Sequence, residues 1–201
     1  MAAPIDFYFD LASPYAYLGS LQIDELAARH GRTVRWRPIM LGAMFKAVGT
    51  GPLMQYPLKG DYSARDLVRC ARLLDVPIKM PPGFPHFTLP AARGFYWLEQ
   101  TGAADTAKAL AQAFYAAYFG EGRDVSGADE TAIIAAGLGV EREAFLAAIQ
   151  DPDIKARLKD ETNAALERGV FGAPFFFSDD EPFWGADRLG HLDRWLETGG
   201  W

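Results

Sequence analysis

One serine is placed where it could stabilise a negatively charged atom of a bound molecule. Ser13 precedes Pro14. Serine is a preferred helix-capping residue, and proline suits the first helical position because it has no N–H to leave unbonded. A helix is therefore expected to begin at Pro14, with the Ser13 hydroxyl at its positive end. Capping alone also explains the pair, so its chemistry depends on what surrounds it.

The chain has one cysteine, Cys70. It therefore lacks a cysteine pair for an intrachain disulfide or for dithiol exchange, and it lacks the thiolates of a zinc site. Cys70 falls on the apolar side of an expected helix, where it would fill the core. The Ser13 hydroxyl can still donate a hydrogen bond to a thiolate that belongs to another molecule.

The two ends of the chain predict the strands of a sheet, because their apolar residues alternate or run continuously between turn residues. The expected elements are a strand over 5–10, a helix from 14 to 30, a strand over 33–36, a hairpin over 172–184 with its turn at 179–180, and a helix from 187 to 199. Both ends therefore supply strands, and each supplies a helix to cover them.

The middle of the chain predicts helices and no strand. The expected helices begin after the capping pattern Ser63-x-x-Asp66, cover residues 107–118, 128–136 and 141–150, and restart at Asp151-Pro152 for a helix that ends at Gly169. Five prolines between residues 76 and 90 predict a stiff loop on the surface or over a site.

This order predicts an α/β protein with a thioredoxin-like fold and a large all-helical insertion. Residues 1–39 and 169–201 would form a discontinuous thioredoxin-like domain, and residues 40–168 would form the insertion. The helix over 151–168 could pack with the thioredoxin-like domain, because a sheet of apolar strands needs cover on both faces.

A thioredoxin-like fold places its reactive group at the start of the first helix, which here is Ser13. The proline of Ala173-Pro174 would enter the neighbouring strand, and in this fold the corresponding proline is cis, although only about 5–6% of X–Pro bonds are cis in general. A cis bond would expose the backbone of Ala173 to an extended peptide. Since glutathione is the obvious cytoplasmic thiol, it is the expected cofactor.

A turn near the C-terminus carries groups that suit the charged ends of glutathione. The turn contains Trp184-Gly185 and Asp187-Arg188. Amides at a helix start near Asp187 could hold a carboxylate, and the Asp187 side chain could either accept from an ammonium or cap its own helix. Arg188 could hold a carboxylate or could be an ordinary solvated charge.

Four motifs, in this order and spacing, resemble those of the 2-hydroxychromene-2-carboxylate isomerase family, relatives of kappa-class glutathione transferases. They are FDxxSPYxY from Phe9, LGAMFK from Leu41, GxPxF from Gly172 and WGxDRL from Trp184. The resemblance covers nearly the whole chain. It implies a glutathione-dependent, homodimeric isomerase in which Ser13 steadies the thiolate, and which acts on an aromatic-derived unsaturated keto acid by reversible thiolate addition.

The residues expected to contact the substrate lie in the insertion. Lys46 and Lys59 could meet its carboxylate and developing enolate, although lysines are mostly solvated. The loops at Thr50 and Phe87 are expected near substrate, and the family commonly carries asparagine in each of them, so this chain departs from the family on the expected substrate side. His86 could carry a proton or be an exposed loop residue.

Charge and composition exclude several other functions. The net charge is −6 with a pI near 5.1, so nucleic acid and membrane surfaces are not expected partners, and the chain is expected in the cytoplasm without a metal. Two alternatives to an isomerase stay open. One is a kappa-like transferase that conjugates glutathione to electrophiles, and the other is a non-catalytic glutathione-binding thioredoxin-like module.

Overall fold

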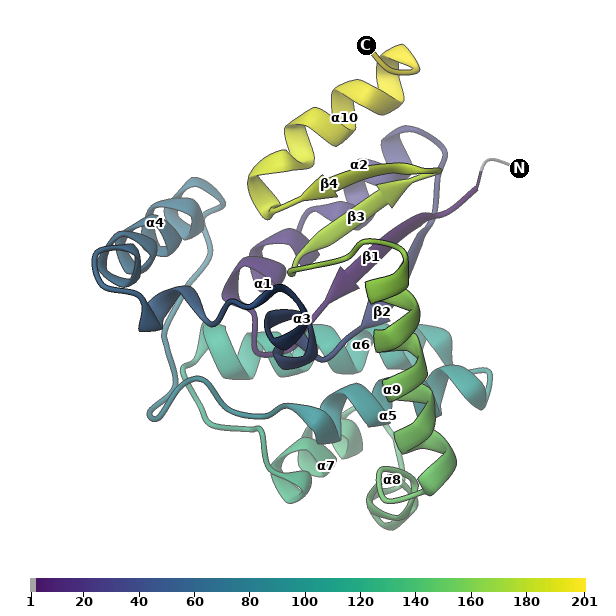
Figure 1. Ribbon diagram of the computed structural model, residues 1–201. Coiled ribbons are helices and arrows are strands. Elements are labelled where there is room, and N and C mark those ends of the chain that lie inside the picture. Colours follow the sequence, from purple (N-terminus) through teal and green to yellow (C-terminus); the bar gives the residue numbers. More distant parts are fainter. Residues whose placement is uncertain (1–2) are drawn as a thin grey trace.

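The computed structural model describes residues 3–201 and contains a four-stranded mixed sheet (Figure 1). The strand order is β2-β1-β3-β4, for β1 (Ile5–Phe9), β2 (Val34–Pro38), β3 (Phe175–Ser178) and β4 (Glu181–Trp184). β1 is parallel to β2, with Ile5 opposite Val34, and antiparallel to β3, with Phe7 opposite Phe176. β3 and β4 form the predicted hairpin. The two ends of the chain therefore build one sheet.

Helices make up most of the rest of the chain. They are α1 (Pro14–Ser20), α2 (Ile23–Arg29), α3 (Leu41–Val48), α4 (Lys59–Leu73), α5 (Leu89–Gln100), α6 (Ala104–Tyr115), α7 (Ala128–Gly137), α8 (Arg142–Ala148), α9 (Pro152–Glu167) and α10 (Leu189–Thr198), with short turns η1 (Leu53–Gln55), η2 (Ala116–Gly120) and η3 (Ala186–Arg188). Between β2 and β3 the described chain contains only helices and loops, as predicted. None of these helices combines the length and the hydropathy needed to cross a membrane.

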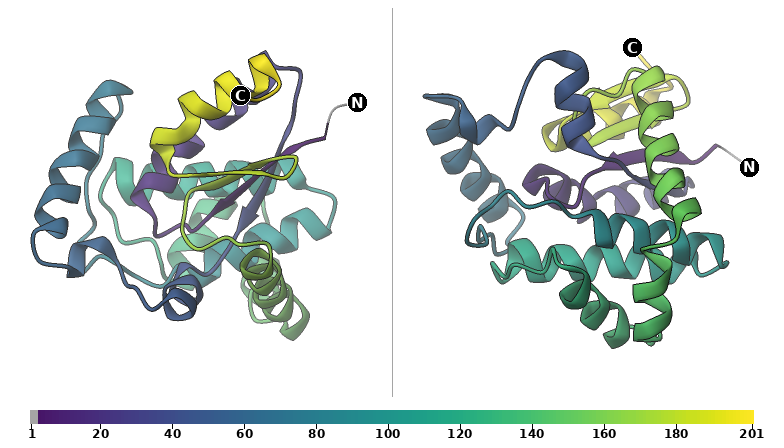
Figure 2. Two further views of the ribbon diagram at one scale, coloured as in Figure 1. Left: turned by 45° about the horizontal axis from the view of Figure 1, so that its top comes forward. Right: turned by 60° about the horizontal axis from the view of Figure 1, so that its bottom comes forward.

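Helices cover both faces of the sheet (Figure 2). On one face, Phe7, Phe9 and Phe176 lie in the main core with residues of α1, α2, α6 and α10. On the other face, Tyr8 and Phe177 pack with residues of α3 and α9. The predicted cover on both faces is confirmed, and α9 packs beside β2. α4 projects from this body at the left of Figure 1.

The first helix is shorter than predicted. It breaks after Ser20, and α2 begins at Ile23, so Leu21 is 45% exposed instead of lying on the apolar stripe. Two side chains bond to backbone carbonyls of the preceding turn: Ser20 Oγ donates to the carbonyl of Tyr17, and the Gln22 amide donates to that of Leu18. Such bonds offer the backbone an alternative to a continuous helix.

Two other predicted helix starts are wrong. α4 begins at Lys59, and Ser63 lies inside it with its hydroxyl donating to the carbonyl of Gly60, so Ser63-x-x-Asp66 is not a capping box. The last helix begins at Leu189, because Asp187 belongs to η3 and its side chain caps neither element. α4 therefore begins before the predicted pattern, and the last helix begins after Asp187. The sequence patterns also gave no sign of α3 or α5 as separate helices.

Candidate functional site

Ser13 lies at the end of the loop between β1 and α1 and is only 4% exposed. Its Oγ accepts a hydrogen bond of 3.2 Å from the N–H of Ala16, which confirms the predicted N-cap with Pro14 at the first helical position. The same hydroxyl donates to the carbonyl oxygen of Ala173 at 3.1 Å. One hydroxyl therefore joins the start of α1 to the segment that enters β3.

The Ala173–Pro174 peptide bond is cis, as expected of this fold. Across residues 3–201, no acceptor is found for the backbone N–H of Ala173. The carbonyl of Pro174 accepts from the N–H of Gly185 at 3.0 Å, which brings the turn after β4 next to this segment. The structure therefore brings four of the predicted residues together: Ser13, Ala173, Pro174 and Gly185.

Trp184 lies beside this segment and is 55% exposed. Its ring packs edge-on against that of Phe171, with 4.8 Å between centroids. Gly172 makes this arrangement possible, since a Cβ at that position would lie 2.5 Å from the Trp184 Nε1. An exposed aromatic wall therefore stands next to the backbone of Ala173.

Asp187 and Arg188 lie in η3, which contacts α1. Their side chains pair at 3.5 Å, and both are substantially exposed. Asp187 does not cap a helix, so one of the two roles that the sequence left open is absent here, and the other, acceptance from an ammonium, stays a prediction. Gly185 has a φ of +108°, a conformation that glycine adopts far more easily than other residues, and it allows the tight turn before η3.

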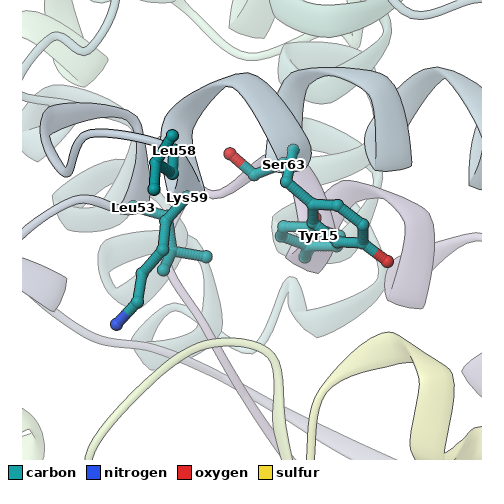
Figure 3. A pocket seen from close by; sticks show the side chains of 6 residues that line it. Tyr15, Leu53, Leu58, Lys59 and Ser63 are labelled. Atoms are coloured by element: carbon teal, nitrogen blue, oxygen red, sulfur yellow. The ribbon is translucent and has the colours of Figure 1, made fainter.

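Tyr15 forms one side of a groove that the sequence analysis did not identify. The groove has a volume of about 330 Å³, and Figure 3 shows Tyr15 facing η1 and the start of α4 across it. Its other lining residues are Leu53, Leu58, Lys59, Tyr62 and Ser63. The ammonium end of Lys59 turns away from Tyr15 and lies 5.5 Å from the ring centroid of Tyr56.

The Tyr15 hydroxyl donates to Asp66 of α4 at 3.0 Å. Burial and the Asp66 carboxylate both raise the pKa of Tyr15, which keeps its hydroxyl protonated. Cys70 lies one turn further along α4, with its Sγ 3.8 Å from Asp66, and the pKa of its thiol is raised by burial, by Asp66 and by Asp187. Cys70 is partly buried against the core, and its surroundings disfavour a thiolate.

Within the residues that the structure describes, the other predicted substrate residues make no direct bond to Ser13, and their role stays a prediction. Lys46, Thr50 and Phe87 are all exposed, Phe87 to 88%, and among residues 3–201 no hydrogen bond or ion pair connects these side chains to Ser13. His86 is held in its loop by the Tyr118 hydroxyl at 2.8 Å from Nδ1, and by Asp124 at 3.4 Å from Nε2. In the part of the chain described, no His, Cys, Asp and Glu side chains gather in a group of three suited to a metal ion.

The chain and its fold have clear relatives among known proteins. Residues 4–197 match the family described as the DSBA-like thioredoxin domain, and this chain belongs to that class. A 2-hydroxychromene-2-carboxylate isomerase of Pseudomonas putida is 35% identical over 191 residues, which span 94% of this chain and 92% of that protein. The chain belongs to the 2-hydroxychromene-2-carboxylate isomerase family.

Two further comparisons agree with this assignment. A solved structure of a 2-hydroxychromene-2-carboxylate isomerase superposes with a TM-score of 0.86 at 34% identity, and the match covers 96% of this chain and 94% of that one. The human glutathione S-transferase kappa 1 is 25% identical over 214 residues, 96% of this chain and 92% of that protein. The expected thioredoxin-like α/β fold and the family resemblance are confirmed. The assigned site residues and the division into two domains stay predictions.

Proposed function

We propose that this protein is a glutathione-dependent isomerase of the 2-hydroxychromene-2-carboxylate isomerase type, which serves the catabolism of an aromatic compound. The observation that carries the proposal is the Ser13 hydroxyl, held between the N–H of Ala16 and the carbonyl of Ala173 beside a cis proline. No cysteine stands at that position, so a reactive sulfur there must come from a bound thiol.

The residues around Ser13 fit glutathione. The N–H of Ala173 can donate to the cysteinyl backbone of the tripeptide, in the manner of an added strand. The exposed Asp187 carboxylate can accept from its ammonium, and Arg188 can donate to a carboxylate. Trp184 then covers one side of the bound peptide, and the turn at Gly185 positions these groups.

Ser13 would act on the sulfur by turning its hydroxyl proton from the Ala173 carbonyl toward it. The Ala16 N–H still donates to Oγ in that orientation, so the cap of α1 is kept. Lowering a thiol pKa by about two units needs about 2.7 kcal/mol, and a hydrogen bond to a charged group contributes about 1.5–3 kcal/mol. α1 has seven residues, so its dipole adds only about 0.3–1 kcal/mol. The hydroxyl therefore provides most of the stabilisation.

Bound glutathione would supply a thiolate that adds reversibly to the activated double bond of an unsaturated keto acid, so that rotation interconverts the isomers and the thiol is returned unchanged. The substrate needs cationic partners for its carboxylate and for the charge that develops on its keto oxygen. Lys46 on α3 and Lys59 at the groove can provide them, and we assign the loops at Thr50 and Phe87 to the same substrate.

The proposal includes a homodimer in the reducing cytoplasm, where glutathione is abundant. Five exposed apolar side chains form what we call the apolar patch, which lies on η1 and the start of α4. They are Leu53, Met54, Tyr56, Leu58 and Tyr62. Contiguous apolar surface of this kind is typical of an interface between subunits.

The proposal also keeps residues 1–39 and 169–201 as the thioredoxin-like domain and 40–168 as the insertion.

The test is turnover of 2-hydroxychromene-2-carboxylate with glutathione present in catalytic amount. We expect conversion to the ring-opened trans isomer without loss of free thiol, no conversion without glutathione, and strongly reduced conversion by Ser13→Ala. Absence of glutathione binding in calorimetry, or turnover that Ser13→Ala leaves unchanged, would contradict the proposal.

A second candidate is a kappa-like glutathione transferase, which the similarity to human glutathione S-transferase kappa 1 favours. It would use the same Ser13 and the same thiol site. Stoichiometric loss of free thiol with an electrophile such as 1-chloro-2,4-dinitrobenzene would support the transferase. A non-catalytic glutathione-binding module predicts tight binding and neither activity.

A further inference from the structure

Asp10, which precedes Ser13 by three residues, forms side-chain hydrogen bonds to three separate segments of the chain. Its Oδ1 accepts from the N–H of Ala12 at 2.8 Å and from the hydroxyl of Thr88 at 3.2 Å. Its Oδ2 accepts from the N–H of Leu41 at 2.7 Å. Ala12 belongs to the loop that carries Ser13, Leu41 is the first residue of α3, and Thr88 immediately precedes α5.

The backbone of Asp10 joins the same contacts. Its carbonyl oxygen accepts from the N–H of Ser13 at 2.8 Å and from the Tyr115 hydroxyl of α6 at 2.9 Å. The side chain and the carbonyl of one residue therefore fix the position of Ser13 relative to the starts of α3 and α5 and to the end of α6.

The segments tied to Asp10 are those that carry the predicted substrate residues. α3 begins at Leu41, carries Lys46 and leads to Thr50. The loop that ends at Thr88 carries Phe87. None of these side chains bonds to Ser13 in the described residues, so their placement relative to it depends on the backbone that Asp10 holds.

A carboxylate suits the position of Asp10 better than the amide of an asparagine would, because every group that faces it is a hydrogen-bond donor. The pKa of its carboxyl group is raised, because burial outweighs the bonds from Ala12, Leu41 and Thr88, which favour the ionised form. Each of its two oxygens nevertheless faces a backbone N–H, and only an acceptor satisfies such a donor. An ionised carboxylate only accepts hydrogen bonds, and it can satisfy all three donors at once. An asparagine has one amide oxygen, and its NH₂ group would face one of these donors. The Leu41 N–H is one of the free N–H groups at a helix start, which need a partner.

We propose that Asp10 is a positioning residue that sets the distance between the Ser13 hydroxyl and the two substrate segments, α3 with Thr50 and the loop before Thr88. The inference rests on the proposed function. It predicts that Asp10 acts more on the turnover of the substrate than on glutathione affinity, because Ser13 is the one proposed glutathione contact on a segment that Asp10 holds, whereas Ala173, Asp187 and Arg188 lie elsewhere.

Three variants test it. Thr88→Val removes the hydroxyl that donates to Asp10 with little change of shape, and Thr88→Ser keeps that hydroxyl. Asp10→Asn keeps the size of the side chain but turns an NH₂ group toward the Leu41 N–H, so that two donors face each other. We expect Thr88→Val to lower kcat for the isomerisation about tenfold, the equivalent of about 1.4 kcal/mol, with glutathione Kd within about twofold of the parent. Thr88→Ser should recover most of the activity. Asp10→Asn should lower kcat further.

Amide hydrogen exchange on the glutathione-bound protein gives a second measurement that needs no turnover. Asp10→Asn should speed exchange at residues 41–50, and Thr88→Val should speed it at residues 84–92. Full kcat in Thr88→Val, or equal losses of kcat and glutathione affinity in all three variants, would overturn the inference. If the parent protein lacks isomerase activity, the proposed function fails, and unchanged exchange in both segments would then overturn the positioning role separately.

Discussion

The hydroxyl of Ser13 donates a hydrogen bond of 3.1 Å to the carbonyl oxygen of Ala173, a residue 160 positions later in the chain. This bond crosses from the start of α1 to the cis-proline segment before β3. Rotation about the Cβ–Oγ bond of Ser13 can turn this proton away from the carbonyl oxygen while Oγ stays in place. A bound thiolate can therefore take this proton's hydrogen bond without any movement of the backbone.

The first prediction concerns the substitution Ser13→Ala. Loss of the hydroxyl should raise the pKa of the bound glutathione thiol by about one to two units, because a hydrogen bond to a charged group contributes about 1.5–3 kcal/mol. The rise of activity with pH should move upward by the same amount, since less thiolate is present at a given pH. The measurement is an ultraviolet titration of the thiolate in the complex.

Ser13→Thr is the matched control, because it keeps a hydroxyl for both the sulfur and the N–H of Ala16. Ser13→Ala should also lower the free energy of unfolding by about 1 kcal/mol through the lost cap. A thiol pKa that is equal in the Ala and Thr variants would show that Ser13 serves only as a cap.

The features that the sequence predicted correctly are determined by residues that are close together in the chain. The start of α1 follows from Ser13-Pro14, the start of α9 follows from Asp151-Pro152, and the hairpin follows from an acidic turn between apolar residues. Each of these features depends on neighbours in the chain. The covered sheet also followed, because its strands read as apolar on both faces.

The features that the sequence did not predict depend on distant partners. The bond from Tyr15 to Asp66 joins residues 51 positions apart, and the bond from Thr88 to Asp10 joins residues 78 apart. The close approach of α1 to Pro174 is another such feature, because a Cβ on Gly19 would lie 3.4 Å from the proline ring. The spacing of apolar residues within one segment cannot predict contacts with a distant segment.

The second prediction concerns Gly172→Ala. A Cβ at this position would lie 2.5 Å from the indole Nε1 of Trp184, so the ring must move away from the segment before Ala173. Forced displacement of a packed side chain typically destabilises a protein by about 1–3 kcal/mol. We expect a lower melting temperature and a glutathione Kd raised about tenfold, because the wall beside Ala173 is lost.

Gly190→Ala is the control, since a Cβ on Gly190 of α10 meets no atom within 4 Å. That change should raise stability by about 0.5–1 kcal/mol, because alanine favours a helix more than glycine does. Calorimetry with glutathione measures both variants. Equal affinity in Gly172→Ala and the parent would mean that Trp184 takes no part in binding.

The third prediction concerns Asp6 and stability at low pH. Burial would raise the pKa of Asp6, but hydrogen bonds and positive charge from Arg168 and Arg37 outweigh it, and the pKa is lowered. Arg37 Nε lies 2.9 Å from Asp6 Oδ1, and an Arg168 guanidinium nitrogen lies 2.6 Å from Oδ2. A lowered folded pKa gives stability that is present above the unfolded pKa of about 3.9 and is lost as the pH falls below it.

Asp6→Asn should therefore reduce the free energy of unfolding by about 2 kcal/mol at neutral pH, and by much less below the folded pKa of Asp6. Asp193→Asn is the comparison, because its bonds to His30 and Arg29 also lower the pKa of Asp193 but are exposed to solvent. Its effect should stay below about 1 kcal/mol. Urea unfolding across the pH range measures the free energy of unfolding of both variants. If the loss of stability in Asp6→Asn did not change with pH, the lowered pKa of Asp6 would not be the source of that stability.

The last prediction concerns the proposed homodimer and the apolar patch on η1 and α4. Leu58 is 84% exposed within this patch, and Leu73 is 86% exposed at the other end of α4. A Leu side chain that becomes buried contributes about 1.5–3 kcal/mol, and in a twofold dimer each substitution occurs twice in the interface. Leu58→Asp should therefore raise the dimer dissociation constant by at least about a hundredfold. Leu73→Asp should leave it nearly unchanged. Sedimentation equilibrium distinguishes these results, and a dimer that both variants preserve would exclude the apolar patch as the interface.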